Sequence, residues 1–556
     1  MALPDSVERD DVDEAPQSLL HELERLLPKV VRPARYTGNE WNSIVKEWPG
    51  KLHVALAYPD VYEEGIGHPL VLAIYDALNR ADDILCERAF LPWPDMEQAL
   101  RAAGLRLYTL ESKRPLTDFD IILVALPGEL YAPSLLTLID LAGLPLYTGQ
   151  DSQAASGNVD GGRGQALSTP VVVGIGPGTA NPEPLAAFFD AFIIGDVDAT
   201  IVRQAAEITR CGERPLPAGL YLPRLYSISY AQDGTIASIG GDIPVTAYWR
   251  GEPAPSVTRP IVPFVETRHE WGIVELAHPP AYPWLDEAWP ERPVEDILAD
   301  VEAILSSTGY DHIQLAGRHS RLAEIVDRLS ARYRGMHLHF SLETAGANAR
   351  IVDIADRLPR LTRGMLTFDM DAGDHDDIVA AAQLAFRRGW HIVKLTTSPG
   401  RPDGPTVTDI VTLARRVMDV GRAEVDGRAQ VHVVAAPFIP RPHSPWQRTG
   451  MVVGQEWERW VDTLSKGMRG PGLRLQWQGL TTRLVEAALA RGDRRLGQVI
   501  ATAWRSGMHH PDQCQDSTAW QAAFDAAGLD IAFYAVRERP DNEILPWQHI
   551  SIVSRR

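Results

Sequence analysis

The stretch GIVELAHPPAYPWLDEAWPERP, residues 272–293, begins as a buried strand and then turns into a loop rich in proline and tryptophan. Five more apolar runs follow it, with helix-length segments between them. The six predicted strands span residues 272–277, 312–317, 337–343, 364–370, 391–397 and 431–438. Six strands that are each followed by a helix predict a partial (β/α)6 TIM-like barrel, whose working face lies at the C-terminal ends of the strands. The loop after the first strand would then lie where the chemistry takes place.

A second alternation of strands and helices precedes the barrel. Its predicted strands are 52–59 (LHVALAYP), 105–112 (LRLYTLES), 118–127 (DFDIILVALP), 170–178 (PVVVGIGPG) and 191–196 (AFIIGD). Nearly continuous apolar strands with helices between them are typical of a parallel sheet that is covered on both faces. We therefore expect an α/β chain with a doubly wound domain before the barrel.

A length of 556 residues suggests about three domains at roughly 100–200 residues each, and the patterns divide the chain into five parts. The parts are an N-terminal helix and connector (1–50), the doubly wound domain (51–205), a linker with a hairpin or two (206–260), the barrel (261–445) and a helical, Trp-rich C-terminal region (446–556). Locally, Asp374 is the expected N-cap of the helix after the fourth barrel strand, and Gly389 its C-terminal stop.

Composition excludes several classes of protein. The net charge of −19 opposes binding to nucleic-acid phosphates unless a basic patch forms locally. No run approaches the ~20 apolar residues that cross a bilayer, and the acidic N-terminus is not a secretion signal. We therefore expect a cytoplasmic protein with no membrane partner. The three cysteines, Cys86, Cys211 and Cys514, lie far apart, which argues against a disulfide framework and a local thiolate metal site.

Candidate binding residues lie after two strands of the doubly wound domain. Asp60 and His68 follow the first strand, and Gly174, Gly176 and Gly178 lie at the end of a later one. Ligands of open α/β sheets bind beyond the C-terminal ends of the strands, and glycine lets the backbone approach a ligand closely. The same GIGPG sequence also suits a tight connection between a strand and a helix. Both interpretations are open at this point.

The barrel strands end in three carboxylates, Glu343, Asp369 and Asp371. The two aspartates could form a pair for acid–base chemistry or for a hard cation, or they could be a solvated turn before the next helix. His337 and His339 place two imidazoles on one strand face, as in metal-dependent hydrolase barrels. They stand at the start of their strand, however, which is the wrong end of the barrel, and we expect no metal there.

Longer segments of the chain resemble a known family. They are RPARYTGNEWNSIVKEW (32–48), ALAYPDVYEEGIGHPLVLAIYDALN (55–79), PWPDMEQALRAAGLRLYTLESKRPLTDFDII (92–122), NPEPLAAFFDAFIIGD (181–196), PFIPRPHSPWQ (437–447), ARGDRRLGQVIATAWRSG (490–507), AGLDIAFY (527–534) and LPWQHI (545–550). Together they resemble the cobalamin (B12)-binding-domain radical SAM proteins, above all an uncharacterised bacterial subfamily often found next to a small radical-SAM-associated protein. The resemblance implies a Rossmann-like cobalamin domain followed by a (β/α)6 radical SAM barrel.

In that family, the loop after the first barrel strand carries a CxxxCxxC motif. Its three thiolates hold a [4Fe–4S] cluster, and the fourth iron binds S-adenosylmethionine (SAM). The aligned positions here are Pro280, Trp284 and Glu287, and none supplies a thiolate. The acidic-glycine motif after the fourth strand (369–373) and the GLP turn after the fifth (400–402) are altered too. The resemblance therefore implies a degenerate barrel that has lost its cluster and SAM.

The resemblance leaves cobalamin binding open. The common family signature DxHxxG, whose His ligates cobalt, is absent because Val61 and Tyr62 follow Asp60. His68 is the one imidazole near this position in the sequence. The glycines at 174–178 could still admit the tail of the corrin.

Our preferred hypothesis is a pseudoenzyme that acts as a cobalamin-binding or scaffold partner of an intact radical SAM homologue or an associated protein. The alternative is an active enzyme that transfers methyl groups with cobalamin, or that uses Glu343, Asp369 and Asp371 with a borrowed metal. A third alternative is a nucleic-acid-associated module, which would need the basic segments RPARY (32–36) and ARGDRR (490–495) on one face.

Overall fold

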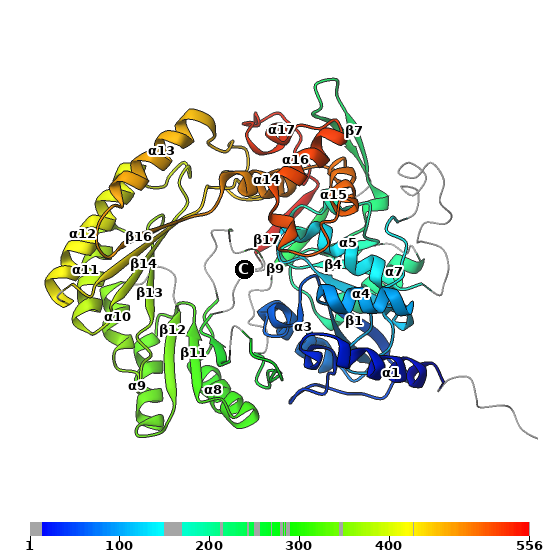
Figure 1. Ribbon diagram of the computed structural model, residues 1–556, viewed down its shortest axis with the longest axis horizontal. Helices are drawn as coiled ribbons and strands as arrows, with labels where there is room; N and C mark the ends of the chain where they lie inside the picture. The colour runs from blue at the N-terminus through cyan, green and yellow to red at the C-terminus, as the bar shows by residue number, and fades with distance from the viewer. Residues whose placement is uncertain are drawn as a thin grey trace, which may run out of the picture.

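The computed structural model describes residues 14–148, 169–211, 215–241, 244–249, 256–267, 270–277, 282, 284, 290–343, 348–425 and 427–554. These residues form two lobes (Figure 1). The first lobe combines the N-terminal part of the chain (blue to cyan) with the C-terminal helices (red), and the second holds the barrel segments (green to orange). None of the helices in these ranges is both long and apolar enough to cross a bilayer.

A six-stranded sheet in the order β2-β1-β3-β4-β5-β6 is the centre of the first lobe. Its strands and the helices that join them are β1 Leu52–Tyr58, α3 Pro69–Asn79, β2 Ile84–Phe90, α4 Pro94–Ala103, β3 Ile121–Ala125, α5 Ala132–Leu141, β4 Val171–Ile175, β5 Ala191–Ile193, α7 Ala199–Cys211 and β6 Leu220–Tyr221. Strands β1 to β5 are parallel, and β6 is antiparallel to β5.

Both faces of this sheet are covered. Val54 and Leu56 of β1 pack in a core with α3 and α7, whereas Ala55 and Ala57 pack in a second core with α5. Alternate residues of one strand therefore enter opposite cores, which explains why the strand is apolar without interruption. The predicted parallel sheet with helices on both faces is present.

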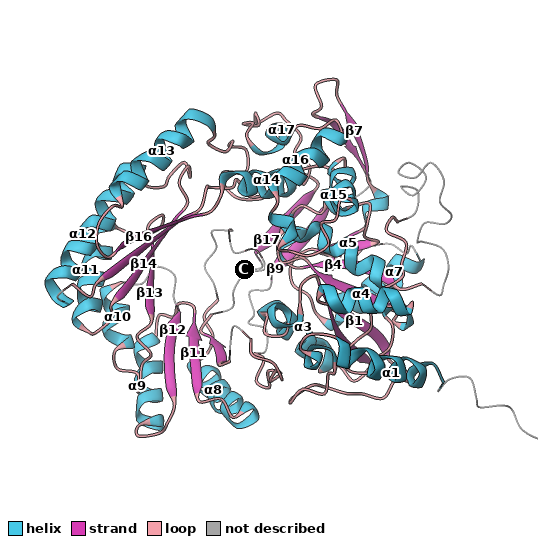
Figure 2. Cartoon of the chain, in the orientation of Figure 1, coloured by secondary structure: helices cyan, strands magenta, loops and turns pink. Residues whose placement is uncertain are grey.

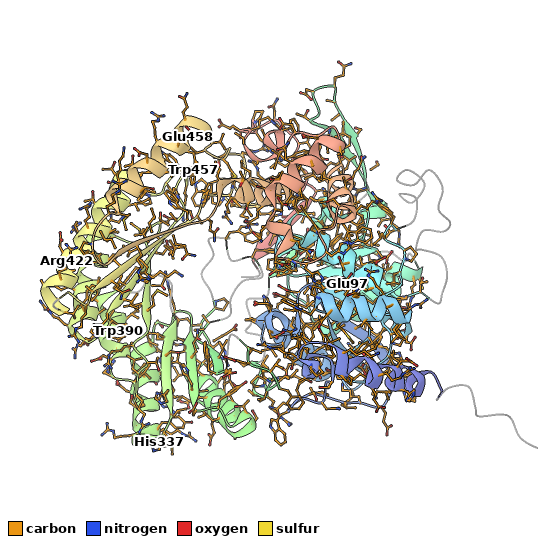
Figure 3. All side chains as sticks on the ribbon, in the orientation of Figure 1. Glu97, His337, Trp390, Arg422, Trp457 and Glu458 are labelled. Carbon is orange, nitrogen blue, oxygen red and sulfur yellow. The ribbon has the colours of Figure 1, made fainter. Side chains whose placement is uncertain are left out.

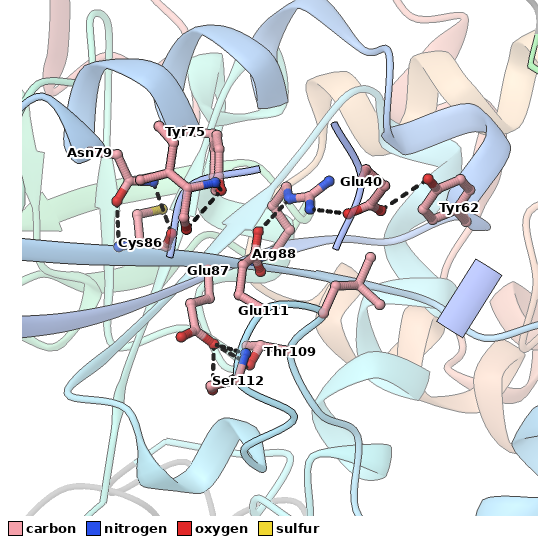
Figure 4. Close-up of polar contacts among 12 residues, drawn as sticks. Glu40, Tyr62, Tyr75, Asn79, Cys86, Glu87, Arg88, Thr109, Glu111 and Ser112 are labelled. Carbon is pink, nitrogen blue, oxygen red and sulfur yellow. Dashed lines mark hydrogen bonds and ion pairs between the residues drawn. The ribbon is translucent and has the colours of Figure 1, made fainter. Parts of the chain in front are cut away.

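The edge strand β2 was not predicted from the sequence. Every residue of ILCERAF is buried, including Glu87 and Arg88. Arg88 is paired with two buried carboxylates, Glu40 (Nη2 to Oε2, 2.8 Å) and Glu111 (Nε to Oε1, 2.7 Å) (Figure 4). A guanidinium between two carboxylates tolerates burial that an unpaired charge would not. The charged residues Glu87 and Arg88 interrupt the apolar pattern of the strand. Nothing in the neighbouring sequence indicates that these charges have partners, so the segment does not look like a buried strand.

The predicted strand 105–112 is wrong. This segment forms no strand of the sheet, and its side chains instead supply partners for the charges of β2. The hydroxyl groups of Thr109 and Ser112 donate to Glu87 Oε2 at 2.5 and 2.6 Å (Figure 4). The apolar and polar residues of this segment alternate because it lies along the edge strand β2, although it is not itself a strand of the sheet.

The linker contains the predicted hairpin, formed by β7 (Ser227–Tyr230) and β8 (Ile236–Gly240). It also contains β9 (Val245–Trp249), which pairs in parallel with β17 (Ile550–Ser554) at the end of the chain. The C-terminus thus returns to the linker and lies near the centre of the molecule (Figure 1).

All six predicted barrel strands are present in the second lobe. Its strands and helices are β10 Gly272–Glu275, α8 Val294–Thr308, β11 His312–Ala316, α9 Leu322–Tyr333, β12 His339–Glu343, α10 Ala349–Ala355, β13 Met365–Asp369, α11 His375–Arg387, β14 Ile392–Thr397, α12 Val407–Val425, β15 Gln430–Ala435, α13 Gly454–Gly467 and β16 Leu473–Trp477. They form two parallel sheets, β10-β11-β12 and β13-β14-β15-β16. The strands are the inner layer and the helices the outer layer (Figure 2).

Strand β16 lies in the region that was predicted to be helical. Its sequence LRLQW places Arg474 and Gln476 on its more exposed face, and this short alternation was overlooked. The rest of the region forms α14 Leu480–Arg491, α15 Leu496–Arg505, α16 Ser517–Ala526 and α17 Ile531–Ala535. These helices share one hydrophobic core with the α5 face of the first sheet, where Phe188, Val499 and Trp520 are buried together. The N-terminal helix α1 (Glu14–Leu26) packs on α4.

Candidate functional site

The strand order of the first lobe marks where a ligand would bind. In open α/β sheets, ligands bind outside the carboxyl ends of the strands at the point where the strand order reverses, and here that point lies between β1 and β3. Asp60 and His68 follow β1, and the turn Glu129–Tyr131 follows β3. The two predicted residues therefore lie beside the switch point of the sheet.

Asp60 is buried and caps the backbone that leaves β1. Its Oδ1 accepts a hydrogen bond from the Val61 amide at 2.7 Å, and its carbonyl accepts one from Leu91 at 3.0 Å. Burial raises the pKa of Asp60 to about 6, although the Val61 amide acts in the opposite direction. The carboxyl group thus stabilises the turn and titrates close to neutral pH.

His68 is the N-cap of α3, and its Nδ1 accepts from the Leu70 amide at 3.3 Å. Its ring lies 5.1 Å from the ring of Tyr58. Burial lowers the pKa of His68 to about 4, so the imidazole is neutral at pH 7. A neutral ring that accepts through Nδ1 carries its proton on Nε2. His68 therefore has no nitrogen lone pair free for cobalt unless the helix cap is given up.

The glycines of GIGPG lie against side chains of the protein itself. A Cβ on Gly174 would lie 2.5 Å from the Phe192 ring, and one on Gly178 would lie 2.8 Å from the Leu126 Cβ. Gly176 has φ +95°, where a side chain is strained, and a Cβ there would meet Leu70 at 2.7 Å. The glycines make room for Phe192, Leu126 and Leu70. This geometry favours a tight connection over a cradle for a corrin tail.

Two aromatic residues of the loop after β10 pack against other parts of the chain. The buried hydroxyl of Tyr282 lies 2.9 Å from Thr179 Oγ1 and accepts from the Gly195 amide at 3.0 Å. Trp284 donates from Nε1 to the Pro442 carbonyl at 3.0 Å. Tyr282 thus inserts into the first lobe, beside the segments that follow β4 and β5.

Trp284 is one of the three positions aligned with the cluster cysteines, and its indole ring lies under the Arg441 guanidinium at 5.2 Å. The other two positions, Pro280 and Glu287, lie outside the described residues.

Arg441 connects this loop to two carboxylates of the first lobe. It pairs with Glu129, directly after β3, and with Glu486 of α14. Burial alone would lower the pKa of Arg441, but the two carboxylates outweigh it and hold the pKa above its usual value. Nearby, His443 Nε2 lies 2.9 Å from the Ala180 carbonyl oxygen. The switch point is therefore bordered by a packed set of internal contacts.

Two of the three carboxylates at the barrel strand ends, Asp369 and Asp371, accept hydrogen bonds from neighbouring residues. Asp371 accepts from Thr397 Oγ1 at 2.7 Å and from the Ser398 amide at 2.8 Å, so it ties the end of β13 to the end of β14. Burial raises the pKa of Asp371, and these two hydrogen bonds offset part of that effect. Asp369 accepts from the Asp371 amide at 3.0 Å. Glu343 is the last residue of β12, and its side chain lies outside the described set.

The residues present do not fit an iron–sulfur cluster. Such a cluster needs thiolates that converge, but Cys86 lies in β2, Cys211 ends α7 and Cys514 lies between α15 and α16. The sequence 272–293 contains no cysteine. Within the described ranges, no three His, Cys, Asp or Glu side chains are placed to hold a metal ion.

His337 contacts Arg360 through Nδ1 at 2.9 Å, at the opposite end of its strand from Glu343. It lies at the lower end of the barrel lobe in Figure 3.

Arginines of both basic segments form ion pairs with carboxylates. In RPARY, Arg32 and Arg35 both pair with Glu63. In ARGDRR, Arg494 pairs with Glu183 at 2.6 Å, and Arg495 pairs with Asp493 within the same segment. Neither segment offers a free basic face of the kind that nucleic-acid phosphates require.

Arg441 and the anchoring role of Tyr282 were not predicted from the sequence. Both stand among prolines, in PFIPRPHSPWQ and PPAYPW, and such segments have no periodicity that would indicate a buried face. The sequence does show an isolated arginine or tyrosine between prolines. This pattern is compatible with an anchoring side chain, but it does not indicate which residues the side chain contacts.

Comparison with known proteins gives one family and several distant structures. A family described as "Radical SAM proteins, N-terminal" matches residues 71–229, which contain most of the first sheet. No curated protein matches the chain.

The similar solved structures include the radical S-adenosylmethionine methyltransferase TsrM from Kitasatospora setae with cobalamin and a [4Fe–4S] cluster bound. It is 11% identical with a TM-score of 0.45, over 86% of this chain and 100% of that one. Another is the apo form of the cobalamin-dependent S-adenosylmethionine radical enzyme OxsB, 12% identical with a TM-score of 0.38, over 97% of this chain and 65% of that one. At these TM-scores the structures do not establish a shared fold. The match over residues 71–229 shows that this part of the chain is similar to the N-terminal part of radical SAM proteins.

Proposed function

We propose that this chain is a radical SAM family member without radical chemistry of its own, which acts as a scaffold partner of an intact homologue. One observation carries the proposal: the loop after β10 has no cysteine, and its Tyr282 and Trp284 are held by other parts of the chain. In an active member, cluster thiolates would occupy this loop. Here Tyr282 of this loop instead contacts Thr179 and Gly195 of the first lobe.

The scaffold form of the proposal is better supported than the cobalamin-binding form. The location of Asp60 and His68 at the switch point favours a ligand there. Against it, the space beside the GIGPG glycines is taken by Leu70 and Leu126, and the His68 ring caps α3. A corrin would have to displace these packed side chains, so we propose binding of a protein partner ahead of binding of cobalamin.

An enzyme that uses the barrel carboxylates is less well supported. Asp371 already accepts two hydrogen bonds, and Asp369 accepts one from the Asp371 amide. A carboxylate that is engaged in this way is a poor ligand for a hard cation, which would compete with the Thr397 hydroxyl and the Ser398 amide.

Metal and cobalamin content test the proposal directly. The protein is reconstituted anaerobically with iron, sulfide and hydroxocobalamin, desalted, and examined by visible spectroscopy with iron and cobalt analysis. We expect neither Fe–S absorption nor stoichiometric iron. The matched control is the C86S/C211S/C514S variant. Iron that binds near four per chain in the wild type and is lost in this variant would overturn the proposal, whereas a retained corrin spectrum would restore the cobalamin-binding form.

The scaffold role predicts a complex with an intact radical SAM homologue from the same organism. Sedimentation of an equimolar mixture is expected to give a species heavier than either protein alone. Two independently sedimenting proteins, together with an inactive reconstituted chain, would contradict the scaffold role.

A further inference from the structure

A small cavity lies where α14 ends, between α17 and the turn that joins β7 to β8. Its lining includes Gly234 and Thr235 of that turn, together with Arg491, Tyr534, Arg537 and Arg539. The cavity has a volume of about 10 Å³, which is enough for one water molecule or one small ion.

Positive charge is in excess around this cavity. Three arginines line it, Arg491, Arg537 and Arg539, together with the carboxylates of Asp493 and Glu543. Both carboxylates are already paired: Glu543 with Arg537, and Asp493 at 2.7 Å with Arg495, which lies outside the lining. Arg491 and Arg539 form no ion pair among the described residues, although Arg491 is 0% and Arg539 3% exposed. With both carboxylates paired, Arg491 and Arg539 remain as two buried positive charges, in a chain whose net charge is −19.

The two unpaired guanidiniums are only partly satisfied by the backbone. Arg491 Nη1 donates to the Ala535 carbonyl at 2.8 Å, at the end of α17, and Arg539 Nη2 donates to the Arg491 carbonyl at 2.7 Å, at the end of α14. Each arginine therefore faces the negative end of a helix dipole, which accounts for part of its stability.

Further polar atoms of the cavity lining are buried without any partner. They are the Nε–H groups of Arg491, Arg537 and Arg539 and the hydroxyl of Tyr534. Each of these four is a hydrogen-bond donor, and an arginine cannot act as an acceptor. One water molecule accepts at most two hydrogen bonds, so a water would leave donors unsatisfied. An anion accepts from all of them and also neutralises charge.

We propose that this cavity is a binding site for a small monovalent inorganic anion of the size of chloride. Arg491, Arg539 and Tyr534 hold the ion, and Arg537 closes the site from the more exposed side. The direction of two titrations agrees: burial, together with the neighbouring arginines, lowers the pKa of Arg491 to about 9, and burial lowers that of Arg539 to about 10. A bound anion would raise both pKa values, because it favours the charged form of each guanidinium.

Thermal unfolding tests the site, with sodium chloride exchanged for sodium gluconate at constant ionic strength. An ion that binds only the folded state raises the melting temperature, by roughly 1 °C for each tenfold increase above its dissociation constant in a chain of this size. We expect this rise for the wild type and for the matched control R422M, whose arginine is exposed on α12 (Figure 3). Bromide is expected to replace chloride, and chlorine NMR line broadening gives an independent readout.

Two variants locate the ion. R491M removes one of the unpaired charges and is expected to abolish both the chloride dependence and the line broadening. Y534F removes a single donor and is expected to weaken chloride roughly tenfold; it serves as the test if R491M does not fold. Chloride independence of the wild type, or a chloride effect of equal size in both variants, would overturn the proposal. Stabilisation by sulfate but not by chloride would overturn the assignment of size.

Discussion

His443 joins the segment after the barrel to the first lobe through a ring whose charge depends on pH. Burial lowers its pKa to about 4, whereas the ordinary value for His is near 6.5. As pH falls below about 6.5, the unfolded chain binds a proton that the folded chain does not yet bind, so the free energy of unfolding decreases until the pH reaches about 4. Above about 6.5 the residue has no such effect.

The variant H443Q keeps a donor for the Ala180 carbonyl but cannot be protonated. We expect its free energy of unfolding to fall less than that of the wild type between pH 6.5 and 4, by on the order of 2 kcal/mol at pH 5. Urea titrations at several pH values measure the difference. Parallel curves for the two proteins would show that His443 titrates normally in the folded state.

Tyr282 contributes through its hydroxyl as well as its ring. In Y282F the Gly195 amide and the Thr179 hydroxyl lose a buried partner, which is expected to cost about 1–3 kcal/mol of the free energy of unfolding. The matched control is Y147F, because that hydroxyl has an exposed contact with Arg505 and its loss should cost less than about 0.5 kcal/mol. Equal effects of the two substitutions in urea denaturation would refute the anchoring role.

At the scale of the element, β2 depends on the Glu40–Arg88–Glu111 group. In R88M the two carboxylates, with side chains 0% and 1% exposed, keep their burial but lose their cation. Breaking such a group is expected to cost about 3–5 kcal/mol. The control R88M/E40Q/E111Q removes all three charges and should recover much of that loss. Thermal unfolding and proteolysis of both variants distinguish a charge effect from a simple loss of packing.

For the whole molecule, the arrangement predicts that the C-terminal helices are required by the first lobe. They share its hydrophobic core through residues such as Val499 and Trp520, on the face of the sheet that α5 also covers. A chain that ends at residue 445 would expose this face to water and is expected to aggregate. A soluble 1–445 fragment with native near-UV circular dichroism would show that the first lobe folds without these helices.

Much of the fold could be predicted because apolar periodicity is a local property. All six barrel strands were found, and Asp374 caps α11 as expected, accepting from the Asp376 and Asp377 amides. Gly389 has φ +94° just after the same helix, where glycine has no steric penalty. The predictions were wrong where a segment depends on residues that are distant in the sequence. Strand β2 contains charges whose neutralising groups lie outside the strand, and residues 105–112 alternate between apolar and polar without joining the sheet.

For the candidate site too, some features follow from the sequence and others from the tertiary structure. The sequence by itself determined that the loop after β10 has no thiolate, since residue types are fixed whatever the fold. It also placed Asp60 and His68 after β1, because strand ends follow from the apolar run. Only the tertiary structure decided that Tyr282 inserts beside Thr179, that the GIGPG glycines lie against Leu70 and Leu126, and that two arginines near the C-terminus share a cavity. The physical reason is that burial and charge pairing depend on segments that are far apart in the chain, and no local pattern records which of them meet.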